Sequence, residues 1–266
     1  MNMADISKLG ISNPYRQRYD NFIDGKFSAP VNGVYFKNSS PIFGKTFCEV
    51  ARSCNADIEL ALNAAHAAAP LWAASSASQR AQLLIQIAER MESNLALLAM
   101  AETLDSGSPI YDTTAADIPL AIDHCRYTAN CIAAHAQTPS ALARHVLAYH
   151  IERLPGVTAH ILPATFPMLA AICKLVPALA AGHTIVLKPA EQTPASIMVL
   201  MELIADLLPP GVVNIVNGFA HEAGKHLAAS KRLSPVIVTG ETGTGLLILQ
   251  YIEQASPLKQ RLSSAR

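Results

Sequence analysis

The chain has 266 residues and 51% of them are hydrophobic, so it can bury a substantial core and is not disordered as a whole. Its 20 basic and 20 acidic residues cancel to a formal net charge of zero, which argues against binding nucleic acid through its phosphates. Its 5 cysteines form no C-x-x-C pair, and an odd number indicates reduced thiols.

Residues 1–140 are predicted to hold an N-terminal arm, a β hairpin and several helices. Asp24 and Gly25 lie between apolar residues, a strong signal for a hairpin over residues 21–27. Two further extended stretches are expected near 34–36 and 46–50. Apolar residues at helical spacing then predict helices over about 57–72, 78–104 and 115–136.

From residue 157 onward, strands and helices alternate four times. Short apolar runs predict strands over 157–162, 184–187, 212–216 and 236–238. Helices are expected over 168–181, 221–229 and 244–254. A further helix is expected to begin after Thr193, which can cap it, and to end before Pro209. This alternation favours an α/β fold with a doubly wound parallel sheet.

No targeting or membrane segment is expected. Residues 1–10 lack the apolar run of a signal peptide. Residues 168–187 could cross a bilayer by length, but Lys174, Pro177 and Gly182 favour a buried helix followed by a strand. We therefore predict a cytoplasmic protein with no membrane and no nucleic-acid partner.

A doubly wound sheet binds its ligands beyond the carboxyl ends of its strands. Lys188 ends one predicted strand and can donate to ribose hydroxyls, while Glu191 can accept from two hydroxyls and would repel a 2′-phosphate, which favours NAD over NADP. In the loop Thr239–Gly245, Gly240, Thr242 and Gly245 are candidates to place backbone N–H groups against a pyrophosphate. Glu241 fits less well there, because its charge opposes a phosphate.

Each of these signals is weak alone, because a lysine at a strand end is more often a solvated charge and a glycine loop is often only a turn. His124, Cys131 and His135 lie near one face of a predicted helix, but their spacing is not a standard zinc pattern. We interpret them as structural and predict no metal site.

Seven segments form a recognisable series in order and spacing: Asn21–Gly25, Glu102-Thr103 with Asp105 and Gly107, Phe166-Pro167, Lys174 with 177–182, 186–191, 209–214 and 239–245. Together they resemble the aldehyde dehydrogenase superfamily over nearly the whole chain after the first ~15 residues. The Gly240-Glu241-Thr242 sequence is similar to the bacterial acetaldehyde and aliphatic aldehyde branch, which makes Glu241 less anomalous.

The resemblance implies a Rossmann-type parallel sheet with an N-terminal helical and β-hairpin region and a β arm. The N-terminal region would be 1–140, the arm 141–155, the NAD-binding core 156–256 and a tail 257–266, with the catalytic domain missing. The arm serves oligomerisation in the family, so it would pair with a second copy or with a full-length relative. Loss of the strand that normally follows the core would leave a sheet edge unpaired.

The resemblance also implies a mechanism. A cysteine thiolate attacks the aldehyde, hydride passes to NAD, and a glutamate-activated water hydrolyses the thioester. The strand that carries this glutamate is expected at 256–260, which contains none, and the cysteine is expected beyond Arg266. Thr165 stands where the family has an oxyanion-stabilising asparagine.

These departures predict a family member that oxidises no aldehyde alone. Two alternatives remain open. One is a pseudoenzyme that binds NAD or a partner without catalysis, and the other is one half of a split dehydrogenase.

Overall fold

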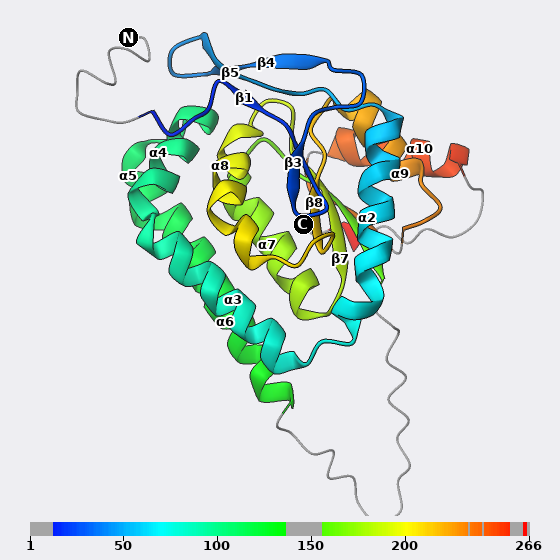
Figure 1. The fold of residues 1–266 in the computed structure, drawn as a ribbon. Coiled ribbons are helices and arrows are strands. Elements are labelled where there is room, and N and C mark those ends of the chain that lie inside the picture. The colour runs from blue at the N-terminus through cyan, green and yellow to red at the C-terminus, as the bar shows by residue number, and fades with distance from the viewer. Residues whose placement is uncertain (1–12, 137–155, 234, 241, 256–262, 265–266) are drawn as a thin grey trace, which may run out of the picture.

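A seven-stranded sheet forms the centre of the molecule (Figure 1). The computed structural model describes residues 13–136, 156–233, 235–240, 242–255 and 263–264. The strand order is β10-β9-β6-β7-β8-β2-β3, and the strands from β10 to β8 run parallel, which confirms the expected α/β class. The strands are β2 (Asn21–Ile23), β3 (Lys26–Ser28), β6 (Val157–Ile161), β7 (Thr184–Lys188), β8 (Val213–Ile215), β9 (Val236–Val238) and β10 (Ser263–Ser264).

The central strand β7 is buried along its whole length, so both sheet faces are covered. Its alternate residues enter two separate cores, Ile185 and Leu187 on one side and Val186 on the other. Helices α2 (Asn55–Ala73), α9 (Lys225–Ala229) and α10 (Thr242–Ala255) pack on the Val186 side. On the other side lie α3 (Ala77–Ser93), α4 (Leu95–Ser106), α6 (Ile118–Ala136), α7 (Pro167–Ala180) and α8 (Ala195–Ile204).

The predicted hairpin forms and belongs to the central sheet. Asp24 and Gly25 make its turn with φ angles of 53° and 73°, and β2 pairs antiparallel with both β3 and β8. Asn214 in β8 also accepts a hydrogen bond from the Asp24 N–H through Oδ1 at 3.0 Å. The sheet therefore combines residues from the predicted N-terminal part with those of the predicted core. A smaller sheet has the order β1-β5-β4 and consists of β1 (Arg18–Tyr19), β4 (Tyr35–Ser40) and β5 (Lys45–Ala51).

The helix predicted over 78–104 was wrong as a single element. It is two helices, α3 and α4, that meet at Asn94, where the backbone leaves the helical region with φ −120° and ψ 22°. The Asn94 amide donates to the Arg90 carbonyl at 2.8 Å, competing with the backbone pattern as asparagine side chains do. The helix predicted over 115–136 is α6, and it is preceded by α5 (Ile110–Asp112) and a π turn over Thr113–Asp117.

Two further expectations were wrong. Thr193 does not cap α8, because its hydroxyl donates to the Ala164 carbonyl at 3.2 Å and Pro194 is the N-cap residue. The edge expected to be unpaired is not at β9, because β10 pairs with it. The arm predicted at 141–155 and the segment 256–260 lie outside the described residues. Among the helices that the structure describes, none is long and apolar enough to span a membrane.

Gly211 provides a test of how the β8 loop packs on α2. Its φ is +76°, and a Cβ there would lie 2.5 Å from the Ala64 carbonyl oxygen. Gly33 has a similar φ of +68° with no atom within 4 Å of a Cβ, so it is a matched control. We expect Gly33→Ala to cost about 1–2 kcal/mol of unfolding free energy from backbone strain, and Gly211→Ala to cost about 1–3 kcal/mol more from the clash. Urea denaturation measures both, and equal losses would contradict this packing.

Candidate functional site

A cavity of about 550 Å³ lies at the carboxyl ends of β6, β7 and β9, where a doubly wound sheet binds ligands. Four segments border it: the loop between β6 and α7, the loop between β7 and α8, the start of the π turn Ala220–Gly224 after β8, and the start of the loop after β9. Its lining residues are Ile161, Leu162, Pro163, Ala164, Thr165, Lys188, Ala190, Glu191, Gln192, Ala220, Thr239 and Gly240. The sheet therefore brings together Thr165, Lys188, Glu191 and Gly240, which the sequence had marked separately.

Lys188 and Glu191 form an ion pair inside this cavity. The Lys188 Nζ lies 2.8 Å from Glu191 Oε2, and the lysine side chain is 1% exposed while the glutamate side chain is 23% exposed. Burial lowers the pKa of the Lys188 ammonium, and the neighbouring carboxylate opposes this effect. Burial of Glu191 raises its pKa, but the lysine and backbone donors outweigh burial, so the net pKa is lowered. Glu191 is therefore an ionised acceptor at the cavity wall.

Thr165 is exposed at the cavity and is followed by a strained residue. Phe166 has a φ of 49° and is 53% exposed, a left-handed conformation that is rare for a bulky side chain. Helix α7 begins immediately after it at Pro167, so Thr165 stands just before a helix N-terminus. A strained backbone of this kind persists only where the surrounding structure holds it in place, and strained residues are concentrated at functional sites.

The glycine loop is only partly at the cavity. Thr239 and Gly240 line it, and a Cβ at Gly240 would meet no atom within 4 Å, so the loop is open there. Thr242 and Gly245 lie in the first turn of α10 and do not line the cavity. Glu241 lies outside the described residues. The assignment of this loop to a pyrophosphate thus stays a prediction.

Two buried carboxylates hold the helices that follow the cavity loops, and sequence reasoning gave neither a role. Glu102 accepts from the Met168 N–H of α7 at 3.1 and 3.3 Å, and Asp105 accepts from the Ser196 N–H of α8 at 2.8 Å. Both belong to α4 and are at most 1% exposed. The matching pattern Glu102-Thr103-x-Asp105 was visible in the sequence, but its partners lie 66 and 91 residues away.

None of the cysteines lines this cavity. Burial raises the pKa of the Cys125 thiol to about 12, and it also raises the pKa of Cys48 and Cys173. These thiols are therefore poor nucleophiles. His124 and Cys131 both belong to α6, and no cluster of three metal-ligating side chains occurs in the part of the chain that the structure describes.

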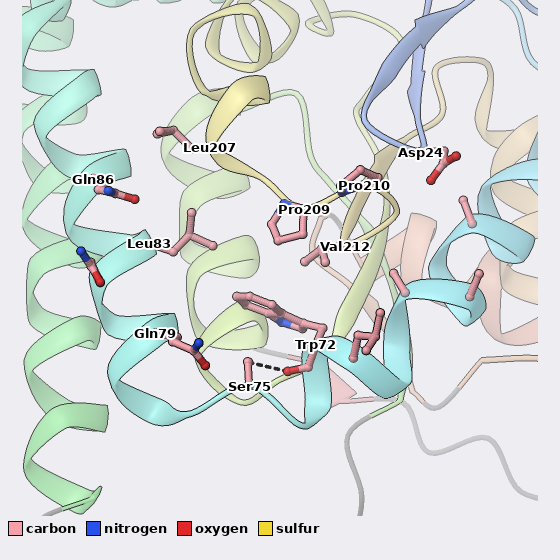
Figure 2. Close-up of a pocket in the computed structure, with 15 residues that line it drawn as sticks. Asp24, Trp72, Ser75, Gln79, Leu83, Gln86, Leu207, Pro209, Pro210 and Val212 are labelled. Atoms are coloured by element: carbon pink, nitrogen blue, oxygen red, sulfur yellow. Dashed lines mark hydrogen bonds between the residues drawn. The ribbon is translucent and has the colours of Figure 1, made fainter.

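A second cavity of about 710 Å³ lies away from these strand ends (Figure 2). It is bounded by the end of α2, the start of α3 and the loop before β8, and Figure 2 shows the Trp72 ring extending from α2 toward α3. Asp24 is its one ionisable lining residue among those described, beside Ser75, Gln79, Gln82 and Gln86. It lacks the paired charges of the first cavity, so we place the candidate site at the strand ends.

Comparison with known proteins gives consistent findings. Residues 29–263 match the aldehyde dehydrogenase family. The chain is 56% identical over 254 residues to acetaldehyde dehydrogenase 2 of Cupriavidus necator, which covers 96% of this chain and 50% of that protein. It is 54% identical over 239 residues to fluoroacetaldehyde dehydrogenase of Streptantibioticus cattleyicolor, covering 90% and 47%. The chain thus spans about half the length of the curated relatives it matches.

Solved structures with a similar fold include an aldehyde dehydrogenase and a protein in complex with NAD. AldC from Pseudomonas syringae, determined with NAD+ and octanal, is 32% identical with a TM-score of 0.85, and the match covers 95% of this chain and 51% of that one. PnpE in complex with nicotinamide adenine dinucleotide is 35% identical with a TM-score of 0.83, covering 94% and 50%.

The buried Glu102 carboxyl predicts a pH dependence of stability. Burial raises its pKa from 4.5 to about 8 in the folded chain, so the folded state binds the extra proton between these values. The unfolding free energy should therefore fall as pH rises, by at most about 1.4 kcal/mol per pH unit. We expect the difference between wild type and Glu102→Gln to decrease from about pH 5 to about pH 8. Urea denaturation across this range measures it, and a constant difference would contradict the buried, protonated state.

Proposed function

The chain belongs to the aldehyde dehydrogenase family, and we propose that its 266 residues form the NAD-binding part of an enzyme that oxidises an aldehyde to a carboxylic acid. The observation that carries this proposal is the Lys188–Glu191 pair in a cavity at the carboxyl ends of β6, β7 and β9. Two solved relatives of similar fold contain NAD, which supports the same cofactor here.

The cavity residues fit this cofactor by their chemistry. Lys188 would donate to a ribose hydroxyl, and the ionised Glu191 would accept from the ribose hydroxyls while its charge repels a 2′-phosphate. Because Gly240 has no side chain and no atom lies within 4 Å of where its Cβ would be, the pyrophosphate of the cofactor could come close to the backbone of the loop after β9. Bound NAD would supply the acceptor for the hydride that leaves the substrate.

We further propose that the aldehyde is small and aliphatic. Two relatives that exceed 50% identity carry the names acetaldehyde dehydrogenase 2 and fluoroacetaldehyde dehydrogenase, which supports this class. Thr165, exposed at the cavity beside the start of α7, would offer a hydroxyl donor to a developing oxyanion.

We propose that these residues alone do not complete the reaction. The thiols of Cys48, Cys125 and Cys173 have raised pKa values, and no cysteine lines the cavity. A hydroxyl at Thr165 is a weaker oxyanion donor than the family's amide. An NAD-binding pseudoenzyme and one half of a split dehydrogenase are both compatible with such a site, and assays separate them.

Calorimetric titration with NAD tests cofactor binding. Glu191→Gln keeps an acceptor for Lys188 but removes the charge, so we expect NAD affinity to fall about 10-fold, the usual effect of losing a hydrogen bond to a charged group. The preference for NAD over NADP should shrink in the same variant, because the repulsion of the 2′-phosphate is lost.

Glu92→Gln is the matched control, because Glu92 pairs with Arg126 on the surface and lies outside the cavity. It should leave both affinities unchanged. No heat of binding with NAD at millimolar concentration, or equal affinities for wild type and Glu191→Gln, would refute the proposed cofactor site.

Assay of NADH formation with acetaldehyde tests whether the residues suffice for catalysis. We expect no turnover by the 266-residue chain, because no described thiol is both activated and at the cavity. Turnover abolished by Cys173→Ser would overturn this. Co-expression with the catalytic half of a relative should restore activity for a split enzyme and leave a pseudoenzyme silent.

A further inference from the structure

Two loops that follow the neighbouring strands β6 and β7 border the candidate cavity and are hydrogen-bonded to each other. The first runs from Leu162 to Phe166, after β6, and the second from Pro189 to Pro194, after β7. The Leu162 N–H donates to the Lys188 carbonyl at 3.0 Å, and the Thr193 hydroxyl donates to the Ala164 carbonyl at 3.2 Å. A shift of either loop is therefore transmitted to the other.

Each loop leads directly into a helix whose first turn is held by α4. Glu102 accepts from Met168, the second residue of α7, and Asp105 accepts from Ser196, the second residue of α8. Residues three apart lie on the same face of a helix, so one rigid face of α4 holds both N-termini. The other Asp105 oxygen accepts from Asn38 Nδ2 at 2.7 Å, which fixes the carboxylate from β4 as well.

The use of carboxyl groups here has a physical reason. The first N–H groups of a helix have no partner within the helix, and a carboxyl oxygen can accept from them whether or not the group is ionised. Neither α7 nor α8 has a side-chain cap of its own, because Phe166 and Pro194 occupy those positions. A residue from outside must therefore fix where each helix begins.

We propose that Glu102 and Asp105 are positioning residues that set the separation of the two cavity loops. They place Thr165 on the first loop and Glu191 on the second, and neither of them lines the cavity. This inference rests on the proposed function for the identity of the ligand, NAD, but the geometry it describes does not depend on that ligand.

Glu102→Ala and Asp105→Ala remove one anchor each. We expect faster amide hydrogen exchange at Met168 in the first and at Ser196 in the second, together with NAD affinity lowered about 10-fold in each. Glu102→Gln and Asp105→Asn keep an acceptor oxygen and should restore most of the affinity, and they serve if the alanine variants fail to fold.

Leu98→Ala is the matched control, because Leu98 is fully buried on the same helix α4. Its side chain has no polar atom, so it cannot accept a hydrogen bond from the Met168 or Ser196 N–H. It should lower stability while leaving NAD affinity and the exchange of Met168 and Ser196 close to wild type. A purely structural role would instead make Leu98→Ala and Glu102→Ala alike in all readouts.

Two results would overturn the inference: exchange at Met168 and Ser196 no faster in the anchor variants than in Leu98→Ala, or unchanged NAD affinity despite faster exchange. Absence of NAD binding by the wild type is a different outcome. It would refute the proposed function, while the exchange measurements would still decide whether α4 holds the loops.

Discussion

The contacts of two carboxyl groups on α4 with the first turns of α7 and α8 organise the region around the cavity. Burying them is unfavourable, and burial raises the pKa of Asp105 to about 6 and that of Glu102 to about 8. They are nevertheless placed where unpaired backbone N–H groups would otherwise be buried. One helix face thereby fixes the starting points of two helices, and these in turn fix the loops that end the central strands.

Local patterns in the sequence were sufficient for much of the fold. The Asp24-Gly25 turn, the β-branched run of β7 and the strand–helix alternation all depend on neighbours in sequence, and each element was predicted within a few residues. The break at Asn94 was missed because the apolar period continues across it from α3 into α4. The Thr193 hydroxyl was misassigned because its acceptor, Ala164, comes from another loop.

The site shows the same division. Lys188 and Glu191 could be selected as candidates because they stand at the end of one recognisable strand and match a family pattern, and strand ends meet at one edge of a parallel sheet. Their mutual ion pair could not be read from spacing alone, since the same three-residue interval could point both side chains at solvent. Glu102 and Asp105 could be recognised as part of a family pattern, but their role could not be predicted, because tertiary packing determines their hydrogen-bond partners.

The position of the hairpin in the sheet has a consequence for the order of folding. Phe22 in β2 pairs with Ile215 in β8, and the Asn217 N–H donates to the Asn21 side chain across 196 positions. During synthesis from the N-terminus, β2 and β3 emerge early but have no strand to join until β8 has left the ribosome. Contacts of such long range slow folding, because a large loop must close before they form. The first hairpin made therefore cannot take its place in the central sheet before β8 is synthesised.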